Sequence, residues 1–281
     1  MAEPRGARGP ALLALTIAAG CVEPLLARAS GARHVDPSTL LVLRYLVAAI
    51  VIGIVGQRRW VGRADALRLT GAGVLLFITS GLALVAFMRL PVAIAVTLVS
   101  ATPLWVAIAS ARREGLGARF FAALALGIVG IVLTAGPIDL ATDAIGIACA
   151  LGATVSSATY RLVIERVGRE YPSSLVSSYV FATGAVLAIV IAPFVPLPDG
   201  FAAGTGAVVG VAAAVSNVSF VAAVAALGAA RTSLALLLQR PVIIALAAVL
   251  LAEPIGWIEG IGVVMVIAAV WLARPAPKAK T

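Results

Sequence analysis

Three charged residues lie inside long apolar runs of the sequence: Glu23, Arg44 and Arg240. A charge at the centre of a membrane span costs about 2.5–3.5 kcal/mol on insertion scales, so such side chains usually pair or face a wet cavity. The two apolar runs that hold Glu23 and Arg44 would cross the membrane in opposite directions. At about 1.5 Å per residue, both residues then lie roughly 20 Å from the same membrane face, at similar depth. A structural ion pair is therefore one hypothesis. The other makes Glu23 a proton or substrate-amine site, because burial raises a carboxyl pKa toward neutrality. For Arg44 we expect the structural role.

Arg240 is flanked by Gln239 and Pro241. A guanidinium fork suits bidentate binding of a planar anion, so Arg240 is a candidate clamp for a substrate carboxylate. Pairing with a carboxylate such as Glu23 is the alternative. Proline removes a backbone hydrogen bond from a helix, so Pro241 and its counterparts Pro24 and Pro103 predict helix breaks.

Uncharged polar and aromatic side chains within the apolar runs are further candidates for a binding site. Asn217 and Gln239 carry amides that both donate and accept hydrogen bonds. Tyr160 is a third candidate. Trp105 faces either a cavity or a neighbouring helix. Arg161, close to the end of its apolar run, is expected to extend its guanidinium to the lipid headgroups.

The composition indicates an all-α integral membrane protein. Of 281 residues, 62% are hydrophobic and 12% charged, whereas soluble domains are about half apolar and a quarter charged. A span needs about 20 apolar residues, which allows roughly ten crossings. Each apolar run should be a helix, because lipid cannot satisfy an open backbone. The predicted transmembrane helices are Ala11–Ala29, Ser38–Gly56, Leu67–Phe87, Pro91–Ala111, Phe120–Gly136, Ile145–Ile164, Ser174–Phe194, Gly204–Leu227, Thr232–Leu251 and Ile255–Leu272.

The distribution of basic residues predicts that both termini are cytoplasmic. Cytoplasmic loops of membrane proteins are enriched in Lys and Arg. With a cytoplasmic N-terminus, the outer segments hold only Arg28, Arg33 and Arg89. The cytoplasmic segments then hold Arg5, Arg8, Arg58, Arg59, Arg63, Arg68, Arg112, Arg113, Arg119, Arg166, Arg169, Arg231, Arg274, Lys278 and Lys280.

Other functional classes find little support. The net charge of +9 is spread between apolar runs, so nucleic-acid binding is not expected. The sequence has one histidine, His34, no metal-ligand cluster and no P-loop, which argues against an enzyme, a metal site, a cofactor or a self-contained ATP-driven pump. The apolar run continues past Cys21, so a retained first helix is preferred over a signal peptide that ends at a lipidated cysteine.

The sequence contains an internal repeat. Thr102-Pro103, Glu114 and Gly130 are echoed by Arg240-Pro241, Glu253 and Gly262. Because five spans is an odd number, consecutive copies must enter the membrane in opposite orientations. The expected fold is therefore ten transmembrane helices in two inverted five-helix repeats, with a binding site near the midplane between the halves. The expected boundaries are 1–138 for the first repeat, 139–274 for the second and 275–281 for a cytoplasmic tail.

The segment Ala93–Gly136, with Ser100-Ala-Thr-Pro103 and Gly127-Ile-Val-Gly130, resembles the EamA domain of the drug/metabolite transporter superfamily. Arg231–Leu272 resembles a second copy. Arg44 also matches an arginine common in the second helix of that domain. The chain departs from the pattern at Ala123, where glycine is frequent, and at Arg240, where glutamate is frequent.

The resemblance implies a ten-helix exporter of amino acids, related organic acids or drugs, with peripheral fifth and tenth helices. The expected setting is a bacterial inner membrane, with membrane lipids, a small-molecule substrate, proton coupling and a homodimer as hypotheses. A flippase for lipid intermediates and a non-transporting partner of an enzyme or sensor are the two alternative functions.

Overall fold

The computed structural model describes residues 5–57, 59–90, 92–134, 143–251 and 256–273, and within these ranges every regular element is a helix. The elements are α1 (Arg5–Gly20), α2 (Val22–Ala32), α3 (Pro37–Val55), α4 (Arg63–Arg89), α5 (Val92–Val99), α6 (Thr102–Glu114), α7 (Ala118–Thr134), α8 (Ala144–Val167), α9 (Ser173–Ile191), η1 (Ala192–Phe194), α10 (Gly200–Leu227), α11 (Ala229–Ala235), η2 (Leu236–Leu238), α12 (Gln239–Leu251) and α13 (Trp257–Leu272).

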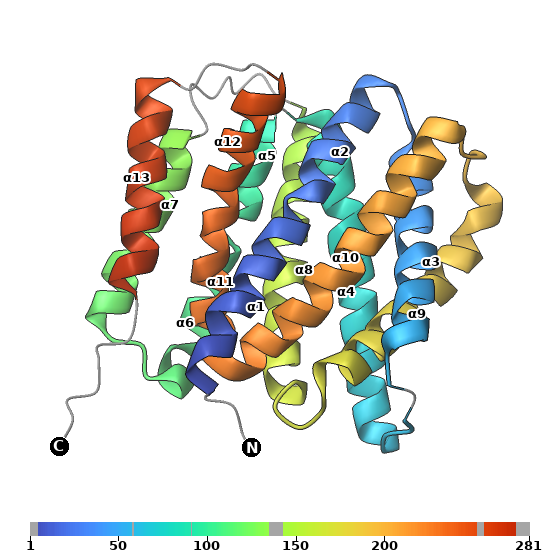
Figure 1. The fold of residues 1–281 in the computed structure, drawn as a ribbon, viewed down its shortest axis with the longest axis horizontal. Coiled ribbons are helices and arrows are strands. Elements are labelled where there is room, and N and C mark those ends of the chain that lie inside the picture. The colour runs from blue at the N-terminus through green and yellow to red at the C-terminus, as the bar shows by residue number, and fades with distance from the viewer. Residues whose placement is uncertain (1–4, 58, 91, 135–142, 252–255, 274–281) are drawn as a thin grey trace.

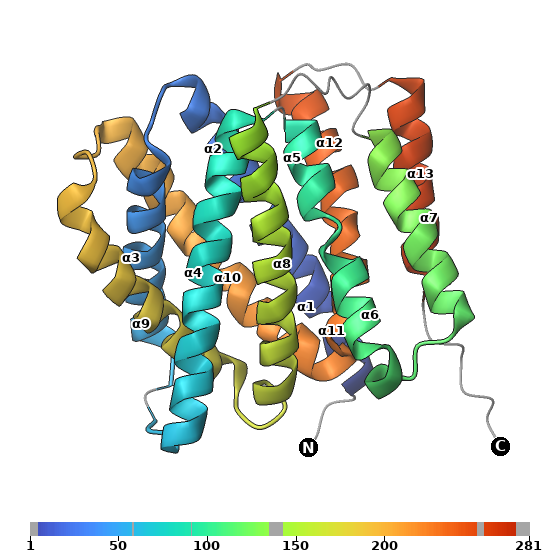
Figure 2. The same ribbon diagram turned by 180° about the vertical axis from the view of Figure 1, so that it is seen from behind.

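Each predicted apolar segment coincides with one helix or with consecutive helices. Six helical stretches are long and apolar enough to cross a membrane, and shorter apolar helices accompany them. The stretches run alternately up and down the bundle, so that α1 begins and α13 ends at the same end (Figure 1). The first helix of the second half, α8, runs opposite to α1 (Figures 1 and 2). The described residues therefore form an all-helical protein with several candidate membrane spans.

Three of the predicted segments are interrupted helices, and each break lies just before a proline. The first stretch breaks at Cys21, three residues before Pro24, and the α5–α6 stretch breaks before Pro103. Before Pro241, the chain forms the short 3₁₀ helix η2. A proline leaves the carbonyl four residues upstream without its usual donor. In α5 the hydroxyl of Thr102 donates to the freed carbonyl of Val99 at 2.7 Å.

Aspartates cap three helices that begin at the same end of the bundle. Asp36, Asp143 and Asp199 accept hydrogen bonds from the first backbone amides of α3, α8 and α10. Such caps satisfy amides that have no partner within the helix. Although desolvation raises the pKa of Asp143, hydrogen bonds from Arg89 and the backbone lower it below its usual value. We call this end the capped end.

The opposite end of the bundle, at which α1 begins, carries most of the exposed arginines, and we call it the basic end. α4 begins there, and α6 and α8 end there (Figure 1). The capped end keeps exposed arginines at positions 28, 33 and 89. The exposed arginines of the basic end are Arg59, Arg63, Arg68, Arg113, Arg119, Arg166, Arg169 and Arg231.

Helices α7 and α13 pack against each other at one edge of the bundle (Figure 1). Glycines bring their backbones together. A Cβ atom on Gly130 would stand 2.8 Å from the carbonyl oxygen of Gly262, and a Cβ on Gly262 would stand 2.5 Å from that of Gly130. Small residues of this kind permit close helix packing in membranes. The two glycines of the sequence repeat are therefore packing partners.

The observed helices differ from the predicted segments mainly at their ends. Several are longer because caps and polar first turns extend beyond the apolar run: α4 begins at Arg63 and α10 at Gly200. The last helix begins at Trp257 instead of Ile255, where the Glu259 carboxylate accepts the Gly256 amide at 3.1 Å. The predicted boundary at 138/139, the tail 275–281 and Glu253 lie outside the described residues.

Candidate functional site

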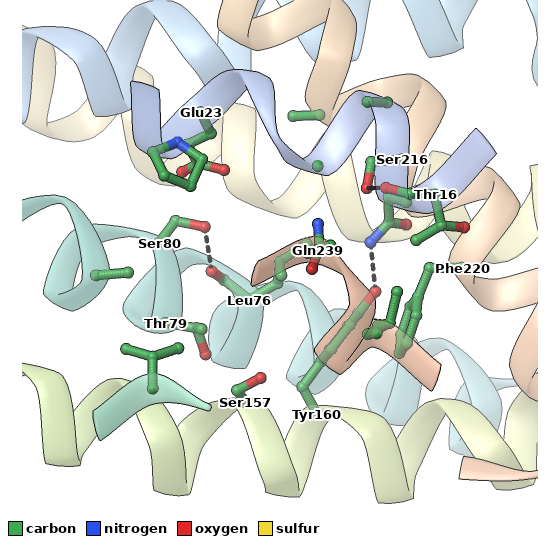
Figure 3. A pocket seen from close by; sticks show the side chains of 18 of the residues that line it. Thr16, Glu23, Leu76, Thr79, Ser80, Ser157, Tyr160, Ser216, Phe220 and Gln239 are labelled. Atoms are coloured by element: carbon green, nitrogen blue, oxygen red, sulfur yellow. Dashed lines mark hydrogen bonds between the residues drawn. The ribbon is translucent and has the colours of Figure 1, made fainter. Parts of the chain in front are cut away.

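A central cavity of about 230 Å³ lies between helices from both halves of the chain. Figure 3 shows side chains from α1, α2, α4, α8, α10 and α12 pointing into it. The cavity touches α1 and α2 at their break and touches the beginning of α12. Its polar and charged lining residues are Thr16, Glu23, Arg44, Thr79, Ser80, Ser157, Tyr160, Arg161, Ser216, Asn217 and Gln239.

Glu23 and Arg44 form an ion pair across α2 and α3 in the wall of the cavity. The Nη1 of Arg44 donates to the Oε1 of Glu23. The Arg44 side chain is 9% exposed and that of Glu23 20%, and both residues line the cavity. The pairing expected from equal depth is thus present. The pair places a carboxylate in the wall of the cavity.

Asn217 joins three helices beside the cavity. Its Nδ2 donates to the hydroxyl of Tyr160 at 2.6 Å, and its Oδ1 accepts from the hydroxyl of Ser177 at 2.9 Å. The residue is buried in α10, while Tyr160 lies in α8 and Ser177 in α9. Both sides of the amide are used, so Asn217 fixes the wall and holds the Tyr160 hydroxyl in place.

Gln239 projects into the middle of the cavity from the first residue of α12 (Figure 3). Its side-chain amide lies against the backbone of Gly20 in α1, where a Cβ atom would overlap the Nε2. The Sγ of Cys21 lies 3.8 Å from the backbone oxygen of Gln239. The breaks before Pro24 and Pro241 therefore meet at this point, and the absence of a side chain at Gly20 leaves room for the Gln239 amide.

A smaller side cavity of about 110 Å³ contains Pro103 and Arg240 in its wall. Arg240 is buried, and its Nε donates to the hydroxyl of Thr134 at 3.2 Å. Glu23 lines the central cavity and not this one. The two cavities share wall residues at Gly20, Pro24, Phe87, Val99, Arg161, Leu236 and Gln239.

The expectation that Arg161 reaches the headgroups was wrong. Arg161 lines both cavities, and its guanidinium lies over the ring of Phe220, 5.4 Å from the centroid. Its Nη1 is buried and has no hydrogen-bond partner among the described residues. The position of Arg161 near the end of α8 suggested that its guanidinium reaches the membrane surface. The rotation of α8 about its axis turns this side chain toward the cavities instead.

Trp105 does not reach either cavity. Its side chain is 53% exposed on the outer surface of α6, so the cavity-facing alternative for this residue is incorrect. Pro241 lies next to Arg240 but is not a wall residue. Among the described residues, no group of three or more His, Cys, Asp or Glu side chains could hold a metal ion.

Residues 144–274, from the first residue of α8 to just beyond α13, match the EamA-like transporter family. This part of the chain is similar to an EamA-like transporter domain. EamA belongs to the drug/metabolite transporter superfamily. Together with the apolar helices, this match indicates a multi-pass membrane protein.

A solved crystal structure, described only as that of a protein, has a similar fold over nearly the whole chain. The match covers 96% of each chain with a TM-score of 0.73 and 19% sequence identity. An identity this low supports a shared fold alone. The fold match extends over both the EamA-like region and the residues that precede this region. No curated protein matches the chain.

One sequence signal could have identified Arg161 as a cavity residue. In the predicted internal repeat, Pro103 corresponds to Pro241, and the separation between these two prolines equals that between Glu23 and Arg161. By this spacing, the position of Arg161 in the second half corresponds to that of Glu23 in the first half. Both residues line the central cavity.

Proposed function

We propose that the protein is a secondary transporter that moves small metabolites through the central cavity by alternating access. The observation that carries this proposal is a polar cavity between two sets of helices, at the point where interrupted helices meet. Secondary transporters commonly bind substrate near the midplane, between repeats and beside discontinuous helices. The EamA-like domain supports the same class of function.

The proposed architecture is ten transmembrane helices in two inverted five-helix repeats, with the division at 138/139 and a tail at 275–281. Opposite directions of α1 and α8 support it (Figure 1). The helix contacts support it as well, because α1 packs on α10 as α8 packs on α4, and α3 packs on α10 as α9 packs on α4. The pair α7–α13 joins the last helices of the two repeats at the edge of the bundle.

The proposed orientation has the basic end and both termini in the cytoplasm. Exposed arginines of the basic end support this orientation by the positive-inside rule. The location in a bacterial inner membrane and the direction of export are parts of the proposal that rest on the resemblance to exporters. Proton coupling would act through the Glu23 carboxylate, since Glu23 is the acidic residue in the cavity wall.

Uptake into proteoliposomes tests the proposal. The purified protein is reconstituted and offered labelled amino acids, organic acids and neutral metabolites, with and without an inward proton gradient. We expect saturable uptake of at least one compound over protein-free liposomes. Gln239→Leu should lower transport kcat/KM about tenfold, because removing a hydrogen-bonding group from a binding site costs about 1–2 kcal/mol.

Gln57→Leu is the matched control, because Gln57 is exposed after α3 and is not among the residues that line the cavity. It should transport like the wild type. Absence of uptake across the panel would contradict the proposal and favour the lipid flippase or the non-transporting partner. Equal loss in both variants would show that the cavity is not the transport site.

A further inference from the structure

The charges in the wall of the central cavity do not balance. The charged residues among those that line it are Glu23, Arg44 and Arg161. Glu23 is engaged by Arg44 in the ion pair between α2 and α3. The Nε–H of Arg44 is buried without an acceptor among the described residues, but the Glu23 carboxylate balances the charge of the Arg44 guanidinium. Arg161 therefore supplies an excess positive charge at the cavity.

The Arg161 guanidinium is placed to bind a ligand. Its Nη1 is buried and has no acceptor among the described residues. Leaving a charged donor buried and unpaired is costly, so native structures rarely keep one without a purpose. The ring of Phe220 covers one face of the guanidinium, which leaves the planar edge with its N–H groups available.

Other residues in the walls beside Arg161 also carry N–H donors, which suit an anionic ligand. Arg161 and Gln239 both line the central and the side cavity, so they stand where these two spaces adjoin. Arg240 also lies in the wall of the side cavity, where its Nε donates to the hydroxyl of Thr134.

We propose that Arg161 binds the carboxylate of the transported substrate, so that the protein is selective for small organic anions. This inference rests on the proposed transport function and names its substrate class. The guanidinium would donate two N–H bonds to a carboxylate, and the Gln239 amide would contact the polar remainder of the molecule. A cavity of about 230 Å³ is below the usual range for drug-sized ligands, which favours a small metabolite.

A binding experiment tests the inference without depending on transport. The full chain in lipid nanodiscs is titrated with carboxylates and their uncharged amides: lactate against lactamide, succinate against succinamide, benzoate against benzamide. We expect the wild type to bind at least one carboxylate and to bind its amide about tenfold more weakly or worse, since a charge-assisted hydrogen bond is worth about 1.5–3 kcal/mol.

Substitutions at Arg161 assign the preference to this side chain. Arg161→Gln should abolish the preference for the carboxylate, and Arg161→Lys should retain it with a Kd about tenfold higher, because lysine keeps the charge and loses the fork. Arg166→Gln, an exposed arginine on the same helix, is the matched control and should bind like the wild type. If Arg161→Gln does not fold, Arg161→Lys provides the comparison.

The outcomes separate this inference from the proposed function. Equal binding of carboxylates and amides by the wild type, no binding of any probe, or an unchanged Kd in the Arg161 variants would overturn the anion site. Uptake of neutral or cationic solutes alone would support transport and overturn the inference. Binding of carboxylates through Arg161 without uptake into liposomes would support the anion site and overturn the transport function.

Discussion

Glu23→Gln is expected to destabilise the folded protein by about 3 kcal/mol, the lower part of the range for breaking a buried ion pair. The substitution leaves the Arg44 guanidinium, 9% exposed, without its counter-charge between α2 and α3. The partial exposure of Glu23 at the cavity is the reason to expect the lower part of that range. Thermal unfolding of the purified protein in detergent, followed by loss of helical signal, measures the effect.

A double-variant cycle separates the ion pair from other roles of the two residues. The variant that carries both Glu23→Gln and Arg44→Gln should be more stable than either single variant, because no uncompensated charge remains. Arg89→Gln is the matched control. It breaks the exposed pair with Asp143 at the capped end, and exposed pairs contribute about 0–1 kcal/mol. A Glu23→Gln variant as stable as Arg89→Gln would contradict the structural role of the pair.

Gly20→Val is expected to reduce transport by more than tenfold while the protein still folds. The new side chain would occupy the space taken by the Gln239 amide, where even a Cβ atom overlaps Nε2. Overpacking of this kind costs about 1–3 kcal/mol when neighbours must shift, and here the shift moves Gln239 into the cavity. Initial rates of uptake into proteoliposomes, normalised to reconstituted protein, measure the loss.

Gly71→Val in α4 is the matched control for Gly20→Val. Both glycines are helical, but a Cβ on Gly71 meets no atom within 4 Å. The control should transport at nearly the wild-type rate. It makes the same change in helix propensity as Gly20→Val, but its side chain overlaps no neighbouring atom. Equal loss in the two variants would mean that valine acts through helix stability and not through the cavity.

Much of this fold is predictable from the sequence because apolar length and charge placement are strong signals in membranes. Lipid forces the backbone into helices, so runs such as Ser38–Gly56 locate α3 to within a residue or two. Counting residues along two antiparallel helices gave the ion pair between Glu23 and Arg44 as one of two hypotheses, and the structure contains this pair. The prolines at 24, 103 and 241 likewise fixed where helices are interrupted.

Side-chain direction is the part that the sequence leaves open. Each residue turns about 100° around the helix axis, so a small change in helix rotation decides between lipid and cavity. Arg161 was expected at the lipid headgroups, but it lines the cavity. Trp105 was expected to face either a cavity or a neighbouring helix, and its side chain is exposed. Apolar and polar faces differ little in a chain this hydrophobic, so periodicity gives a weak guide to rotation.

Accessibility of a single cysteine in the cavity tests alternating access most directly. Ser157→Cys, in a chain with Cys21 and Cys149 replaced by alanine, places one thiol in the cavity wall. An impermeant maleimide is applied to vesicles of each orientation, with a permeant maleimide as the control for reactivity. We expect labelling from both faces of the membrane, with the balance shifted by a substrate gradient. Labelling from one face alone under every gradient would contradict the account.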